Sequence, residues 1–119
     1  MGFFKKKKNK NISLVLCGEE FRLFSQVLQD ELSILESSTS LNLKQSEVYR
    51  VCKRYYVMCQ FDAISNVLAI TFEEFDRSDM LTLIVLLMVA ADNSVDPELK
   101  TKYRLIAGRI QCVHRELGV

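Results

Sequence analysis

The sequence predicts a small, mainly α-helical single domain, built as a bundle of four to five helices. Apolar residues recur every three or four positions through most of the chain, which is the period of an amphipathic helix. Only one proline and four glycines occur among the 119 residues, so little interrupts these helices. Hydrophobic residues make up 49% of the chain, enough for one core at this length. We expect this domain over residues 12–119, with room for one short N-terminal strand or a minimal two-stranded pairing.

Residues 1–11 are predicted to be a disordered basic tail, because adjacent like charges repel and gain nothing from packing. Five lysines lie there: Lys5, Lys6, Lys7, Lys8 and Lys10. Without them, 11 basic residues face 15 acidic ones, so the rest of the chain carries a formal charge of about −4. No apolar segment follows the lysines, so we expect no secretory leader. The four scattered cysteines are typical of a reduced, cytoplasmic protein.

The first elements after the tail are a short extended segment and a long helix. Residues 12–16 are β-prone and end shortly before Gly18. A helix is predicted over about residues 19–36, where two glutamates in the first turn favour the positive end of the helix dipole. Its apolar stripe is Phe21, Phe24, Leu28, Leu32 and Leu35. A polar Ser/Thr loop follows at 37–40.

A second helix is predicted over about residues 43–60. Asn42 is a favourable N-cap, and Gln45 stands three residues later, as a capping box requires. The expected buried stripe is Val48, Val51, Cys52, Tyr55 and Cys59. Cys52 and Cys59 are about 10.5 Å apart along one helix, too far for a disulfide. We therefore expect two buried thiols rather than a zinc site.

Residues 61–75 fit two structures. Apolar residues at 61, 64, 68, 72 and 75 follow the helical period, which favours a helix. The alternative is a buried strand over Val67–Phe72, paired with the extended segment at residues 12–16. A short apolar run cannot be resolved by periodicity alone.

A helix over residues 78–92 contains nine consecutive apolar residues, 83–91. A bilayer span needs about 20 such residues, so we expect no membrane span. A helix that is apolar on all sides is expected to be buried on all sides. It should therefore form the centre of the fold, unless a partner chain completes its burial.

The last helix has the clearest start signal, because Asp96 caps it and Pro97 occupies its first position. It is predicted to run to about Leu117. Its apolar residues follow gaps of four and three, which is a heptad seam. We predict a partner interface at five seam residues: Leu99, Tyr103, Ile106, Ile110 and Val113. Packing against the chain's own domain is the more ordinary interpretation of the same seam. Gly108 is expected to permit a close backbone crossing, either within the chain or between two chains.

No catalytic motif is present, and the chain has a single histidine. We therefore expect a non-enzymatic protein that needs no cofactor and no metal. A reactive Cys17 beside the start of a helix is the one enzymatic alternative, because a helix N-terminus lowers the pKa of a thiol. Glu73, Glu74, Asp76 and Asp79 are best explained by the dipole of the helix that follows them.

The surplus of apolar residues favours a protein–protein interaction module, or a small regulator or inhibitor, that acts through an apolar helical face and self-associates. Its partner would be another protein or a second copy. The alternative is an accessory nucleic-acid-binding protein. Its phosphate contacts would be the tail residues Lys5, Lys6, Lys7 and Lys8, together with Arg50, Lys53 and Arg54 on one helix face.

Overall fold

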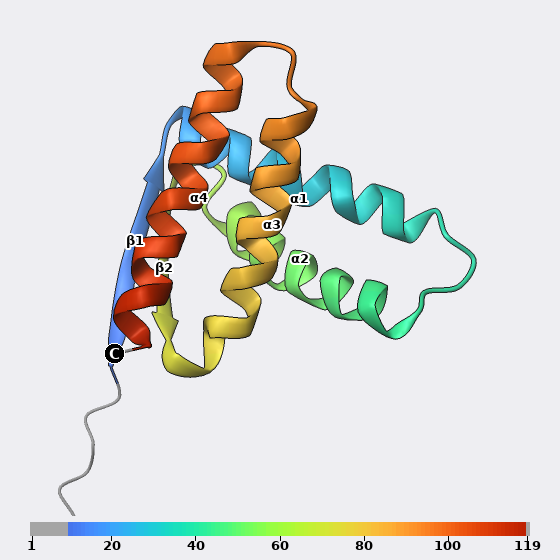
Figure 1. Ribbon diagram of the computed structural model, residues 1–119, viewed down its shortest axis with the longest axis horizontal. Coiled ribbons are helices and arrows are strands. Elements are labelled where there is room, and N and C mark those ends of the chain that lie inside the picture. The colour runs from blue at the N-terminus through green and yellow to red at the C-terminus, as the bar shows by residue number, and fades with distance from the viewer. Residues whose placement is uncertain (1–9, 119) are drawn as a thin grey trace, which may run out of the picture.

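A computed structural model describes residues 10–118 as a helical domain with a small sheet (Figure 1). The described residues form two strands, four α-helices and one 3-10 turn. In chain order these are β1 (Asn11–Cys17), α1 (Glu19–Glu36), α2 (Leu43–Phe61), β2 (Val67–Glu73), η1 (Glu74–Asp76), α3 (Arg77–Asn93) and α4 (Pro97–Leu117). The predicted mainly α fold is confirmed, and so is its minimal two-stranded pairing.

The helices begin where their capping residues stand. The Asn42 side chain accepts a hydrogen bond from the Gln45 backbone at 2.8 Å, and the Gln45 side chain accepts one from the Asn42 backbone at 3.0 Å. This reciprocal pair satisfies two N–H groups that a helix start leaves open. Asp96 likewise accepts from the backbone N–H of Glu98 at 2.9 Å, and Pro97 follows it. Local chemistry therefore sets the starts of α2 and α4.

The helix favoured for residues 61–75 is wrong, and the alternative strand is right. α2 ends at Phe61, and β2 pairs antiparallel with β1 from Cys17↔Val67 to Asn11↔Glu73. Side chains along β2 alternate: Leu68, Ile70 and Phe72 are buried, whereas the residues between them are exposed. The segment forms a strand because β1 has a matching buried face. Pairing with β1 satisfies the backbone hydrogen-bonding groups and buries the alternate side chains of both strands together.

The start of β1 corrects the boundary predicted for the tail. Asn11 already pairs with Glu73, and the Lys10 ammonium donates a hydrogen bond to the Glu116 carbonyl of α4 at 3.0 Å. Residues 10 and 11 are thus held by β2 and α4. The rest of the predicted tail, including Lys5, Lys6, Lys7 and Lys8, lies outside the described residues.

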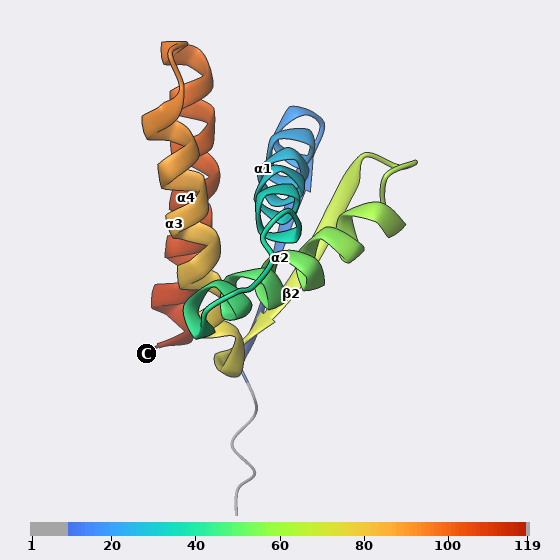
Figure 2. The same cartoon turned by 90° about the vertical axis from the view of Figure 1, so that its right-hand side faces the viewer.

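The helices pack in layers (Figure 2). α3 and α4 lie side by side in one layer, α1 stands in the middle, and α2 lies beyond it with β2. The core joins all of these elements, and its largest fully buried side chains include Phe24, Tyr55 and Phe72. Figure 1 shows that α1 and α2 form a hairpin directed away from the sheet. Among the elements that the structure describes, none covers the outer side of α3.

Candidate interaction surface

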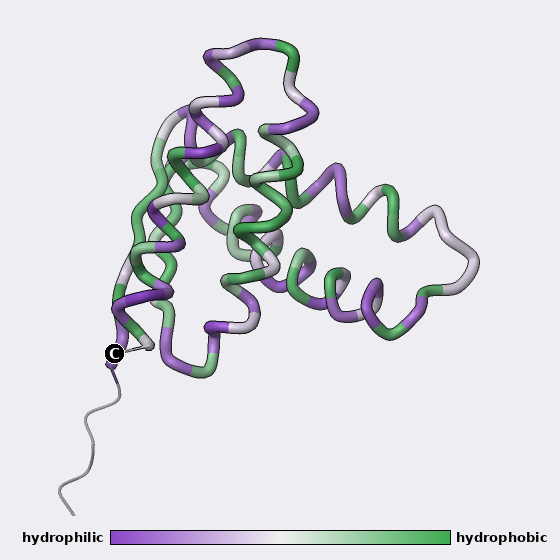
Figure 3. The backbone as a smooth tube through the Cα atoms, viewed as in Figure 1, coloured by the Kyte–Doolittle hydropathy of each residue, from purple (hydrophilic) through white to green (hydrophobic). Residues whose placement is uncertain are grey.

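The outward side of α3 is apolar and exposed. Four large side chains on it keep much of their surface in water: Leu81 at 50%, Val85 at 58%, Met88 at 37% and Val89 at 48%. We call these four residues the α3 surface. The opposite side of the helix packs into the core through Leu83, Leu87 and Ala91. Figure 3 shows that the middle turns of α3 are hydrophobic.

The prediction that this helix is buried on all sides is therefore wrong for a single chain. α4 covers one flank of α3, and α1 and α2 cover its inner side. No described element covers the α3 surface. The reason is geometric: in this layered arrangement the other three helices cannot cover every side of α3.

A groove between α3 and α4 borders the α3 surface on one side. Leu81 and Ile84 form its apolar wall on α3, and Gln111, His114 and Arg115 form its wall on α4. Burial, and then the charge of Arg77, lower the pKa of His114 below its ordinary value. Arg115 therefore supplies the positive charge on this side at neutral pH. We call this edge of the groove, whose charge comes from Arg115, the basic rim.

A cleft between α1 and α3 borders the α3 surface on the other side. Asp30, Glu31 and Ile34 line it from α1, and Val89 lines it from α3. Ile34 is exposed and extends the apolar surface toward α1. Asp30 accepts a hydrogen bond from Gln26 at 2.7 Å. We call Asp30 and Glu31 the acidic rim, so the α3 surface lies between rims of opposite charge.

The C-terminal seam lies mostly inside the chain. Ile106 and Ile110 have no exposed surface, and Val113 is also buried. Only Leu99 and Tyr103, of the five predicted interface residues, are partly exposed. A partner could not reach the three buried residues while the chain stays folded. The residues of the α3 surface, by contrast, are exposed.

Gly108 does not mark a close helix crossing. A Cβ added at this position would meet nothing within 4 Å. The expected approach of another backbone is therefore wrong within the chain, since space for a side chain is present.

Two arginines of α2 are bound to two carboxylates that precede or begin α3. Arg54 donates to Asp76 and to Asp79, each at 2.9 Å, and Arg50 donates to Asp79 at 2.7 Å and also contacts Glu47. Asp76 and Asp79 are buried. Hydrogen bonds to Glu47 and then to Asp79 raise the pKa of Arg50, so it stays charged. This cluster ties α2 to α3 by charge-assisted bonds.

This cluster engages two of the three helix residues that were predicted to contact phosphates. Arg50 and Arg54 are already neutralised by carboxylates, whereas Lys53 is exposed. The dipole explanation for Asp76 and Asp79 missed their arginine partners. The residues at 50, 54, 76 and 79 have helical spacing, but nothing in the sequence says that these two helix faces meet.

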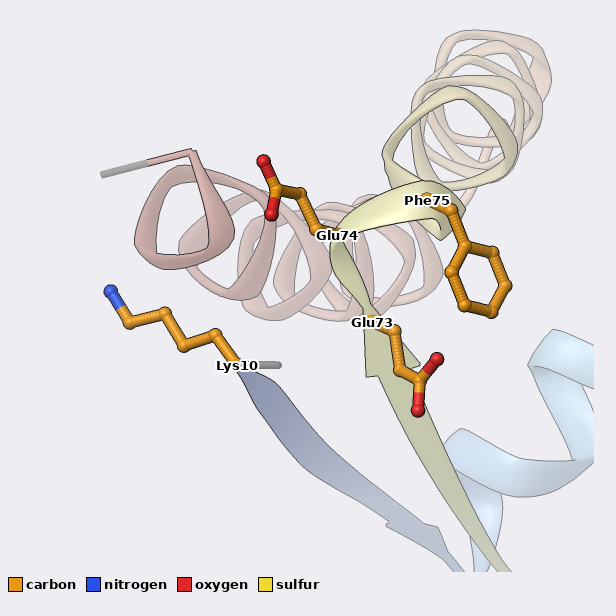
Figure 4. A pocket seen from close by; sticks show the side chains of 4 residues that line it. All are labelled: Lys10, Glu73, Glu74 and Phe75. Carbon is orange, nitrogen blue, oxygen red and sulfur yellow. The ribbon is translucent and has the colours of Figure 1, made fainter. Parts of the chain in front are cut away.

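A shallow pocket lies where the two strands reach the end of the sheet (Figure 4). Lys10, Glu73, Glu74 and Phe75 line it. Figure 4 shows that their side chains diverge, with Lys10 and Glu73 pointing in different directions and Phe75 pointing away from the strands. Charged side chains that point in different directions cannot bind one small ligand together.

The cysteines form neither a disulfide nor a metal site within residues 10–118. Cys17 and Cys112 are exposed, whereas Cys52 and Cys59 are buried. Burial raises the pKa of Cys52 to about 12 and that of Cys59 to about 11. These two thiols therefore stay protonated at neutral pH and act as small apolar core residues.

Comparison with protein-family models, with curated proteins and with solved structures gives no match for this chain. Among the helices of the described residues, none is long and apolar enough to cross a membrane. The function must therefore be inferred from the chemistry of the chain's own surface.

Proposed function

We propose that this chain is a non-enzymatic protein-interaction module that docks its partner on the α3 surface. One observation carries the proposal: four large apolar side chains are exposed on one side of α3. Covering such a patch lowers the free energy, because it removes apolar surface from contact with water. We place the protein in the cytoplasm, where four unpaired thiols stay reduced.

The composition of the α3 surface suits the centre of an interface. No charged residue interrupts α3 between Asp79 and Asp92. Centres of interfaces are depleted in charge and enriched in residues such as methionine, whereas their rims are polar. The basic and acidic rims provide that polar border. The helix itself is anchored to the core by Leu83 and Leu87, so docking needs no refolding of α3.

Site-directed photo-crosslinking tests this proposal. A benzophenone amino acid replaces Val85 in one variant and Met88 in another, and Leu105 on the outer side of α4 in the matched control. We expect a defined, saturable protein adduct from positions 85 and 88 but not from position 105. Leu81→Asp should abolish the adduct, since it places a charge in the apolar contact. Adducts that form equally at position 105, or none at any position, would refute the α3 surface as a docking site.

A further inference from the structure

We infer that the partner on the α3 surface is a second copy of this chain, held in a two-fold symmetric dimer. This inference rests on the proposed function of that surface and names its occupant. It is carried by the charges on either side of the α3 surface: the acidic rim on α1 and the basic rim on α4.

Opposite charges on opposite sides of one patch make that patch complementary to itself. In a symmetric dimer the same patch serves both copies, and residue i of one copy meets residue j of the other at two equivalent places. A two-fold axis that lies in the contact plane, perpendicular to the line joining the rims, places each acidic rim against the other copy's basic rim. The apolar residues Val85 and Met88 then meet near the axis.

Within residues 10–118 the rim charges have no ion-pair partners. Among the described residues, Asp30, Glu31 and Arg115 form no ion pair. Elsewhere on the surface such pairs are common, for example Arg109 with Glu20 at 3.0 Å. A second copy would supply both missing partners at once. An anionic lipid surface would be repelled by the acidic rim, so it fits this face less well.

Sedimentation equilibrium of the full chain over a range of concentrations tests whether it dimerises. We expect a reversible monomer–dimer equilibrium. Val85→Asp should weaken dimerisation at least about 30-fold, because it buries a charge at the centre of the contact. Leu105→Asp, an equally drastic change on the outer side of α4, should leave the dissociation constant unchanged within about twofold. A wild-type chain that stays monomeric at millimolar concentration would overturn the inference.

A charge-exchange experiment then tests the proposed geometry. Glu31→Lys alone and Arg115→Glu alone should each weaken the dimer by about 10-fold, since each places like charges opposite one another. An equimolar mixture of the two variants should regain wild-type affinity as a heterodimer, because both contacts then join opposite charges. Circular dichroism verifies that both variants keep their helices. If mixing restores nothing, the proposed pairing of the rims is wrong.

The two proposals can fail separately. A monomeric chain whose position 85 still cross-links to a different protein would overturn the dimer and leave the docking surface standing. A dimer that is unaffected by Val85→Asp and Met88→Asp would place the contact elsewhere and count against both.

Discussion

Arg54 on α2 donates a hydrogen bond to Asp79 on α3 at 2.9 Å, although these residues are 25 positions apart in the chain. Asp79 is buried, and its second oxygen accepts from Arg50 at 2.7 Å. The guanidinium of Arg54 also lies over the ring of Tyr55, 5.2 Å from its centre. A buried carboxylate is tolerated only where it is paired, so this contact fixes how α2 and α3 sit against each other.

Removal of the Asp79 carboxylate should therefore destabilise the fold. We expect Asp79→Ala to lower the free energy of unfolding by about 2 kcal/mol, because both arginines lose an acceptor in a partly buried place. Urea unfolding measures the change. The matched control is Asp92→Ala, whose exposed carboxylate lies 3.9 Å from Arg104 and should cost less than about 0.5 kcal/mol. If Arg54→Ala costs as much in the Asp79→Ala background as alone, the two residues are not coupled.

The alternation along β2 predicts unequal effects at adjacent residues. Ile70→Ala should lower the free energy of unfolding by about 3 kcal/mol, because it leaves a cavity beside Leu14. Thr71→Ala should cost only about 0.5 kcal/mol, since it removes an exposed hydroxyl that bonds to Ser13 at 3.1 Å. Thermal and urea unfolding both report these values. Equal losses at the two positions would contradict a strand with one buried face.

Two glycines should respond to alanine in opposite ways. Gly108 lies within α4 with open space beside it, so Gly108→Ala should stabilise the chain by about 0.5–1 kcal/mol. Gly18 adopts φ +60° between β1 and α1, where a side chain is strained, so Gly18→Ala should destabilise by about 1 kcal/mol. Melting temperatures of the two variants should move apart. A loss of stability from Gly108→Ala would show that this side of α4 is occupied.

Stability should fall in alkaline solution because of two buried thiols. An unfolded cysteine titrates near its ordinary pKa of 9.0, whereas burial raises the pKa of Cys59 to about 11 and that of Cys52 to about 12. Above pH 9 the unfolded chain releases protons that the folded chain keeps, so deprotonation favours unfolding. Their contribution is fully present below pH 9 and is lost as the pH rises toward the folded-state values.

For each buried thiol, raising the pH from about 9 to about 11 should lower the free energy of unfolding by about 1.4 kcal/mol per pH unit. Urea unfolding across this range measures the slope. Cys59→Ala removes one titrating group, and its slope should be shallower by about 1.4 kcal/mol per pH unit. Cys112→Ala serves as the matched control, since that thiol is exposed. An unchanged slope in Cys59→Ala would contradict its burial as a protonated thiol.

Local signals in the sequence were sufficient for the starts of α2 and α4. The capping box at Asn42 and Gln45 and the Asp96–Pro97 start predicted two helix starts that the structure confirms. These signals work because each depends on residues within one turn of each other. The apolar stripe of α1 likewise predicted its buried side. The thiols of Cys52 and Cys59 were predicted to be buried, and they are.

Only the tertiary structure decided the features that depend on distant residues. Residues 67–73 form a strand because β1, whose residues pair with them from 50 or more positions earlier, supplies a partner of matching period. Asp76 and Asp79 are bound by Arg54 because α2 and α3 meet there. The apolar run on α3 looks the same at every residue in the sequence, yet Leu83 is buried and Val85 is exposed. The hydrophobicity of a residue indicates whether its burial is favourable. The packing of the other helices decides which of the apolar side chains are in fact buried.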